Sequence, residues 1–352
     1  MTDRLTGILL GTAVGDALGL PAEGISPRRR RRWWPGPWRH RFLLGRGMIS
    51  DDTEHSLFVT QALLQHPDAP EAFQRRLAWS LRWWFASLPA GIGRATLRAC
   101  VKLWVGFPPA RSGVFSAGNG PAMRVAMIGG YFYNDPDAME QFVKASTELT
   151  HRDPRAATGA LAVARLAGWA VEHDATKAPK IESISELLGS LVPDDTEWCE
   201  LIEKIVAAHQ DQLPVVEFAA SLGLEKGVTG YIYHTVPVAI YSWFHHYGDF
   251  RETLSAVLDC GGDTDTVGAI AAALAGATVG GEGIPPEWLA GICDWPRSVS
   301  LLRRAAERLE EQMRIGYPQG PVHYCWPAMI PRNLFFLAVV LCHGFRRLGP
   351  PY

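Results

Sequence analysis

The chain has 352 residues, which is long enough to bury a substantial core in one large domain or two small ones. Its formal net charge of −2 gives no overall case for binding nucleic acid or a membrane, and 47% apolar with 20% charged residues is typical of a soluble globular protein. Its six cysteines include no Cys-x-x-Cys pair, which argues against a cysteine zinc site and predicts reduced thiols in a cytoplasmic protein.

The apolar pattern along the chain predicts helices and shows little sign of strands. Apolar residues recur at helical spacing in eight segments, namely 54–65, 72–87, 138–149, 156–171, 199–209, 234–247, 266–279 and 298–314. No low-complexity linker or internal repeat divides the chain. We therefore expect one all-α domain covering residues 1–352.

The N-terminal apolar segment carries glycines at every fourth position: Gly7, Gly11, Gly15 and Gly19. Residues four apart lie on one face of a helix, and each interior glycine costs about 1 kcal/mol relative to alanine. The repeat therefore predicts close packing against another helix, which would place Asp16 and the turn at 21–24 beside a site. The acidic residues and glycines argue against a secretory signal. At the other end, the apolar run 334–342 is too short to span a bilayer and predicts a buried C-terminal helix.

Two acidic motifs stand out. Ser50-Asp51-Asp52-Thr53-Glu54 taken alone fits a helix start, with Asp51 as the cap and Glu54 completing a capping box. The second motif, Cys260-Gly261-Gly262-Asp263-Thr264-Asp265-Thr266, leads into a segment almost free of polar residues, so we expect its carboxylates to lie inside the protein or in a cleft.

Buried carboxylates need a partner, because two such charges about 4 Å apart repel by roughly 4 kcal/mol at an effective dielectric constant near 20. No basic motif lies beside either cluster in the sequence. Carboxylates and hydroxyls are ligands for Mg²⁺, Mn²⁺ or Ca²⁺. If the two motifs meet in space, their four aspartates could hold two divalent ions, as in a two-metal hydrolase.

Other polar features are weaker. Ser116-Ala117-Gly118-Asn119-Gly120 leads into a helix start, which fits either an ordinary loop or an anion-binding turn. His151 could contact a ligand or cap a helix. The aromatic cluster at 231–234 is more typical of a core than of a base-stacking platform. The run Arg28–Arg32 is more typical of a solvated basic face than of a nucleic-acid site.

Six motifs in order resemble the ADP-ribosylglycohydrolase family, which includes the ADP-ribosyl-acceptor hydrolases. They are GTAVGDALGLPAEG (11–24), SDDTE (50–54), SAGNGPAMR (116–124), HRDP (151–154), YHTVP (233–237) and CGGDTDTVGAI (260–270). The resemblance implies a compact orthogonal multi-helix bundle. It also implies a binuclear site, usually for magnesium and sometimes for manganese, that hydrolyses the bond between ADP-ribose C1″ and an acceptor.

The resemblance also implies roles for individual residues. Ser50, Asp51 and Asp52 match one group of metal ligands, and Asp263, Asp265 and Thr266 match the other. Glu23 matches a glutamate near the metals, which makes Glu23, Asp52 and Asp263 the catalytic candidates. Ser116, Gly118, Asn119 and Gly120 match a diphosphate-binding loop, His151 matches a ligand-contacting histidine, and Tyr231 falls at an adenine-stacking position.

The substrate stays open at this level. Ser116-Ala117 lacks the acidic residue that some arginine-directed members carry in this loop, and the acceptor could be arginine, serine, a nucleic-acid base or a small molecule. The expected partners are an ADP-ribosylated protein or small molecule and the product ADP-ribose, with no membrane, and with nucleic acid only as a modified substrate. An ADP-ribose-binding protein without activity and a two-metal phosphoester hydrolase are the alternatives.

Overall fold

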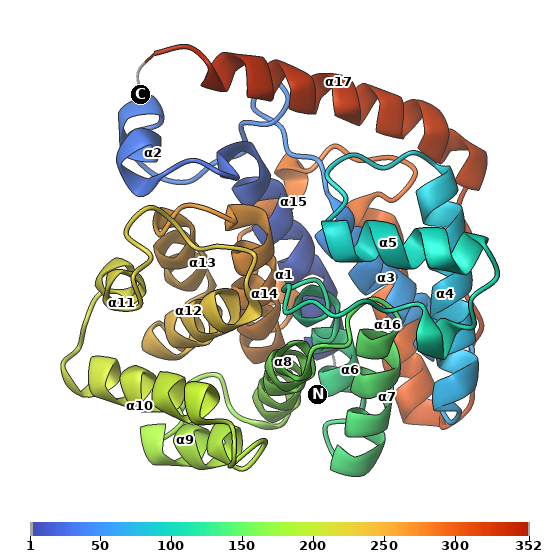
Figure 1. Ribbon diagram of the computed structural model, residues 1–352, viewed down its shortest axis with the longest axis horizontal. Coiled ribbons are helices and arrows are strands. Elements are labelled where there is room, and N and C mark those ends of the chain that lie inside the picture. Colours follow the sequence, from blue (N-terminus) through green and yellow to red (C-terminus); the bar gives the residue numbers. More distant parts are fainter. Residues whose placement is uncertain (1–2, 351–352) are drawn as a thin grey trace.

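The structure, a computed structural model, describes residues 3–350 and is helical throughout (Figure 1). No strand occurs in these residues, which confirms the all-α prediction. The α-helices are α1 (Arg4–Gly19), α2 (Pro27–Trp33), α3 (Asp51–Leu63), α4 (Pro70–Ala86), α5 (Arg94–Trp104), α6 (Ala126–Tyr131), α7 (Pro136–Glu148), α8 (Pro154–Glu172), α9 (Ile181–Gly189), α10 (Thr196–Gln210), α11 (Val215–Ser221), α12 (Ile232–His245), α13 (Phe250–Asp259), α14 (Thr264–Val279), α15 (Pro286–Gly291), α16 (Val299–Ile315) and α17 (Met329–Arg347). Short 3₁₀ helices are η1 (Leu20–Ala22), η2 (Pro109–Arg111), η3 (Ala122–Arg124), η4 (Gly281–Gly283) and η5 (Trp326–Ala328).

All eight helices predicted from apolar spacing form, as α3, α4, α7, α8, α10, α12, α14 and α16. Most begin two or three residues earlier than the apolar pattern, because polar or proline residues occupy their first turns. The acidic motif at 50–54 is an example, since α3 already begins at Asp51. Shorter helices such as α9 and α11 were not predicted, because their apolar stripes span only about two turns.

The predicted glycine seam joins α1 to α14 at the centre of the molecule (Figure 1). A Cβ atom added at Gly7 would lie 2.1 Å from the carbonyl oxygen of Gly276, and one added at Gly15 would lie 2.2 Å from that of Gly268. Real Cβ atoms do not approach this closely, so glycine is required along the seam. Both helices are buried along almost their whole length, which confirms the predicted close helix packing.

The seam also fixes the ends of the two helices. A Cβ atom at Gly19, the last residue of α1, would lie 2.2 Å from the carbonyl oxygen of Thr264, the first residue of α14. The Thr264 hydroxyl donates a hydrogen bond of 2.8 Å to the Gly19 carbonyl. The second acidic motif is thereby held against the turn that follows α1.

The C-terminal apolar run is helical, but the prediction that it is buried is wrong. Helix α17 lies along one edge of the molecule (Figure 1), and Leu334, Leu341 and Phe345 are 51%, 51% and 72% exposed. Its N-terminal turns are held by polar contacts, in which Arg332 pairs with Asp294. By length and apolar composition, two stretches could cross a membrane: Arg4–Ala22, which is fully buried in the core, and Trp326–Arg347, which is 28% buried.

The arginine run forms α2, and its solvation is mixed. Arg28 and Arg31 are exposed, as predicted for a solvated basic face. Arg30 departs from that prediction, because it is buried, stacks over Trp38 at 4.2 Å and pairs with Asp259 at 3.3 Å. Arg28, Arg31 and Arg32 are therefore exposed to solvent, while Arg30 anchors the helix to the body of the protein.

Candidate active site

A cleft of about 360 Å³ opens where the starts of α3 and α14 face the loop before η3. Most of the residues singled out in the sequence line it. On the acidic side these are Glu23, Asp51, Asp263, Asp265 and Thr266, and on the opposite side Ser116, Gly118, Asn119, Gly120 and His151, together with Gly230 and the rim residues Gly91, Gly93, Arg94 and Thr96.

The two acidic motifs lie against each other at the floor of this cleft. Thr266 Oγ1 donates to Asp52 Oδ2 at 3.3 Å, and Ser50 Oγ donates to the same oxygen at 3.3 Å. Asp52 and Ser50 are almost fully buried and lie behind the cleft-lining carboxylates. Asp52 therefore joins the first motif to the second.

Asp16 holds the first motif in position. Its buried carboxylate accepts hydrogen bonds from the backbone N–H groups of Ser50 (2.8 Å) and Thr53 (3.2 Å) and from the Thr53 hydroxyl (2.5 Å). These are orphan donors at the start of α3, so Asp16 caps that helix from a different helix. The sequence placed Asp16 near a site but gave it no such role.

The N-terminus of α3 is capped differently from the way that the sequence of the first acidic motif predicts. Ser50, and not Asp51, is the N-cap residue, and its hydroxyl accepts from the backbone N–H of Asp52. Glu54 does not complete a capping box, because its carboxylate is buried and accepts from Trp84 Nε1 and Arg297 Nη1, each at 2.5 Å. Asp51 is consequently free of a capping role and lies in the cleft.

The floor of the cleft concentrates negative charge. Desolvation first, and neighbouring carboxylates second, raise the pKa values of Asp51, Asp52 and Asp265 well above the ordinary aspartate value. Desolvation also raises the pKa of Asp16 to about 6, although its hydrogen bonds oppose the shift. Such a cluster is costly to keep ionised without a cation.

The donor set fits a hard divalent cation. Asp52 Oδ1 is buried and has no hydrogen-bond partner among the described residues. No three His, Cys, Asp or Glu side chains within residues 3–350 form a metal-ligand group by themselves, so hydroxyls would have to complete any site. Ser50 and Thr266 supply them beside Asp52, and oxygen-only donors favour Mg²⁺, Mn²⁺ or Ca²⁺.

The glycine-rich loop is fixed to the acidic floor through Asn119. The Asn119 side-chain amide donates to Asp263 Oδ2 at 2.6 Å and to the Thr235 hydroxyl at 3.0 Å. Its backbone N–H donates to the carbonyl of Gly230 at 3.0 Å. The loop is therefore ordered by protein contacts that join it to the second acidic motif.

His151 lies directly beneath the two loop glycines. A Cβ atom at Gly118 would come within 3.0 Å of His151 Nε2, and one at Gly120 within 3.2 Å of His151 Cε1. Burial, and then the charge of Arg124, lower the pKa of His151 to about 3, so the imidazole is neutral at physiological pH. Arg124 supports both the loop and the histidine, since it donates to the Gly120 carbonyl and to the Thr150 hydroxyl that contacts His151 Nδ1.

The model of the family described as ADP-ribosylglycohydrolase matches residues 1–318. The chain belongs to the ADP-ribosylglycohydrolase family. This match confirms the resemblance seen in the six motifs, five of which contribute residues to the cleft. The family is one of hydrolytic enzymes.

Several relatives of this glycohydrolase chain cover most of it. An uncharacterized protein of Archaeoglobus fulgidus is 33% identical over 84% of this chain and 93% of its own. The ADP-ribosyl-(dinitrogen reductase) glycohydrolase of Rhodospirillum rubrum is 28% identical over 82% and 90%, and the ADP-ribosylhydrolase ARH3 of Gallus gallus is 27% identical over 81% and 88%. A solved ADP-ribosylglycohydrolase-related protein complex matches with a TM-score of 0.62 and 28% identity, covering 88% of this chain and 98% of that one.

One cation near the glycohydrolase cleft comes from beyond the family match. Arg347, at the end of α17, donates to the carbonyl of Pro21, and its positive charge acts on Glu23 and Asp265. Desolvation by the surrounding protein and the charge of Asp263 raise the pKa of Glu23, and Arg347 opposes that shift. The sequence does not predict a role for Arg347, because the residues around it are typical of a surface helix and form no recognisable motif.

Tyr231 does not line the cleft, in contrast to the other predicted residues on the loop side. Its hydroxyl donates to Glu197 at 2.6 Å and accepts from Arg155 at 3.2 Å. Its backbone forms an isolated antiparallel bridge with Gly118. Tyr231 thus supports the glycine-rich loop through its main chain, while Glu197 and Arg155 hold its hydroxyl.

Proposed function

We propose that this glycohydrolase depends on two divalent metal ions, Mg²⁺ or Mn²⁺, and cleaves the bond between ADP-ribose C1″ and its acceptor. The contact between Asp52 and Thr266 carries the proposal, because it brings both acidic motifs to one side of a cleft whose other side is a glycine-rich loop. The acidic side suits cations, and the loop suits the anionic part of an ADP-ribosyl substrate.

The metal-binding residues would be two groups of three. Ser50, Asp51 and Asp52 form one group, and Asp263, Asp265 and Thr266 form the other. When bound, such ions lower the pKa of water and neutralise charge that develops on reacting oxygens. The unpartnered Asp52 Oδ1 and the raised pKa values of these aspartates support the assignment.

The loop Ser116–Gly120 would bind the diphosphate. Its glycines leave the backbone N–H groups open to an anion, and Arg94 at the rim adds the attraction of an exposed cation. Neutral His151 would hydrogen-bond a substrate oxygen without adding charge. The adenine would lie against the ring of Tyr231, next to Gly230.

Glu23 would transfer a proton during hydrolysis. It lies in the cleft on the turn that follows α1, close enough to Asp263 for the charge of that residue to raise its pKa. A carboxyl with a raised pKa is suited to proton transfer near neutral pH. Asp52 and Asp263 would hold the reacting ribose in position, because a hydrogen bond from Asn119 fixes the Asp263 carboxylate.

The acceptor is proposed as an ADP-ribosylated protein side chain or small molecule. Relatives of this chain are named for dinitrogen reductase and as ADP-ribosylhydrolases, and those names describe those proteins. We place the activity in the cytoplasm, which fits six cysteines that are all free thiols.

A panel of ADP-ribosylated acceptors incubated with purified protein and Mg²⁺, with mass spectrometry as the readout, tests the proposal. We expect release of ADP-ribose, abolished by EDTA and by Asp52→Asn or Asp263→Asn. Asp137→Asn is the matched control, because the exposed Asp137 is the second residue of α7, as Asp52 is of α3. Release in EDTA, binding without release, or release of inorganic phosphate would each overturn it.

A further inference from the structure

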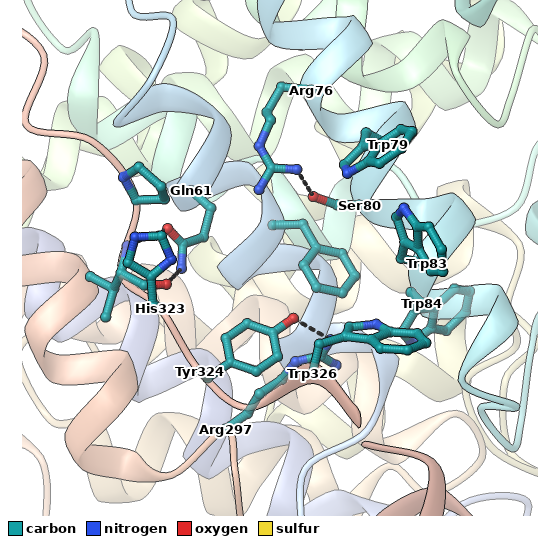
Figure 2. A pocket seen from close by; sticks show the side chains of 13 residues that line it. Gln61, Arg76, Trp79, Ser80, Trp83, Trp84, Arg297, His323, Tyr324 and Trp326 are labelled. Carbon is teal, nitrogen blue, oxygen red and sulfur yellow. Dashed lines mark hydrogen bonds between the residues drawn. The ribbon is translucent and has the colours of Figure 1, made fainter. Parts of the chain in front are cut away.

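A second pocket of about 480 Å³ lies further along α3, where Phe58 and Gln61 line it, and it shares no lining residue with the proposed active-site cleft. Its walls come from α3, α4 and the segment before α17, as Figure 2 shows. Part of that segment, residues 321–326, lies beyond the family match at 1–318. The pocket is therefore partly built from residues outside the family match, and its volume is that of a small-molecule site.

The walls are mainly aromatic. Trp79, Trp83 and Trp326 surround the opening, and Tyr324 lies across from them (Figure 2). The ring centroids of Trp83 and Trp326 are 5.1 Å apart in an edge-to-face arrangement, and those of Trp79 and Trp83 are 5.7 Å apart. Trp79 remains 53% exposed and Trp83 38% exposed, which is a large amount of unpaired ring surface. Such surface favours stacking with a planar aromatic ligand.

The charged lining is cationic. Arg76, Arg297 and His323 line the pocket, and no aspartate or glutamate does. Arg297 is already neutralised, because it is buried and pairs with Glu54 behind the wall. Arg76 has no ion-pair partner among residues 3–350, and its guanidinium donates to the neutral hydroxyl of Ser80 at 3.2 Å (Figure 2). One half-buried positive charge thus faces the aromatic walls without a counter-charge.

We propose that this pocket is a second ligand site, for a small planar aromatic compound that bears an anionic group. The ring would stack on the exposed faces of Trp79 and Trp83, and the anion would pair with Arg76. An aromatic cage could also attract a cation, but the charge of Arg76 would repel one. A neutral ring would leave Arg76 without a partner. The site is independent of the metal chemistry proposed for the cleft.

Three ligands of one shape and different charge test the site by isothermal titration calorimetry: indole-3-acetate, indole-3-acetamide and tryptamine. We expect the anion to bind about tenfold more tightly than the neutral amide, as for one charge-assisted hydrogen bond, and tryptamine to bind most weakly. Arg76→Gln should remove the preference for the anion and leave amide binding unchanged. Arg75→Gln is the control, because Arg75 is its exposed neighbour and does not line the pocket.

Two further variants locate the binding. Trp326→Ala should weaken all three ligands, since it removes one aromatic wall. Asp52→Asn should change none of them, so a failure of the metal proposal leaves this one standing. Equal affinity for the acetate and the amide, no binding at millimolar ligand, an anion preference that survives Arg76→Gln, or binding lost in Asp52→Asn would overturn the proposal.

Discussion

Asp52 and Thr266 are 214 residues apart in the chain, and their side chains meet at 3.3 Å. Each lies in the first turn of its helix, so the contact brings together the N-termini of α3 and α14. Positive helix ends attract the carboxylates, whereas burial first, and the charges of neighbouring carboxylates second, raise their pKa values. The contact between Asp52 and Thr266 depends on three features: the hydrogen bonds of Asp16, the glycine seam between α1 and α14, and a cation that offsets the charge of the carboxylates. Each of these features can be removed separately.

Asp16→Asn should loosen the start of α3. Asparagine keeps one acceptor oxygen, but its amide group would be buried beside the three donors without a partner, since Asp16 Oδ1 has none, so we expect the free energy of unfolding to fall by about 1–3 kcal/mol. Chemical denaturation in EDTA measures it. Thr53→Ser keeps the hydroxyl donor and should cost less. An Asp16→Asn protein as stable as the parent would show that the Asp16 contacts do not hold the motif.

Gly15→Ala should be strongly destabilising although alanine is normally the better helix former. The added methyl would meet the Gly268 carbonyl oxygen at 2.2 Å, and neither backbone can rotate away. We expect a loss at or above the upper end of the about 1–3 kcal/mol typical of overpacking. Gly189→Ala, at the end of α9, is the control, because an added Cβ there meets no atom within 4 Å. Similar unfolding midpoints for the two variants would contradict the seam.

The stability of the metal-free protein should fall as pH rises. Asp16 has its pKa raised to about 6, against about 3.9 in an unfolded chain, so the folded state binds more protons. That stability is complete below pH 4 and is lost as pH rises to about 6, and Asp51, Asp52 and Asp265 extend the loss upward.

Mg²⁺ should reverse this loss, because it binds the ionised carboxylates. We therefore expect Mg²⁺ to raise the Tm more at pH 7.5 than at pH 5.0, measured by differential scanning fluorimetry against EDTA. Asp52→Asn should reduce the gain at pH 7.5. An equal gain at both pH values would mean that these carboxylates are not the metal ligands.

Arg347→Gln should alter proton transfer in the cleft. The charge of Arg347 holds down the pKa of Glu23, so its removal should raise that pKa and shift the acid limb of the kcat/KM profile to higher pH. Arg346→Gln, its exposed neighbour, should leave the profile in place. An unchanged profile in Arg347→Gln would exclude either the contact or the role of Glu23.

Periodic apolar residues and the six motifs were enough to predict the long helices and most of the cleft. The same signals could not assign Asp16 or Arg347, because their roles depend on partners brought together by folding and not on neighbours in the chain. Glu54 illustrates the opposite failure. Its local pattern fits a capping box, but two buried donors, Trp84 and Arg297, bind it more favourably than the helix N-terminus does.

The prediction that α17 is buried was wrong for a related reason. The apolar composition of 334–342 predicts a buried helix. Burial, however, requires another part of the protein to cover the helix. Among the described residues, only the helix face that includes Phe336 is covered in this way. For Tyr231, the motif located the correct loop, while hydrogen bonds to Glu197 and Arg155 decide where its ring lies.

The seam between α1 and α14 has a consequence for protein synthesis. Gly7 leaves the ribosome long before its packing partner, Gly276, is made. At about 5–20 residues per second, an apolar helix waits roughly 10–50 seconds for the helix that covers it. During that interval the nascent chain exposes a surface that chaperones recognise, and the acidic site cannot yet assemble. Translation speed over residues 20–264 therefore sets how long this enzyme depends on cellular folding factors.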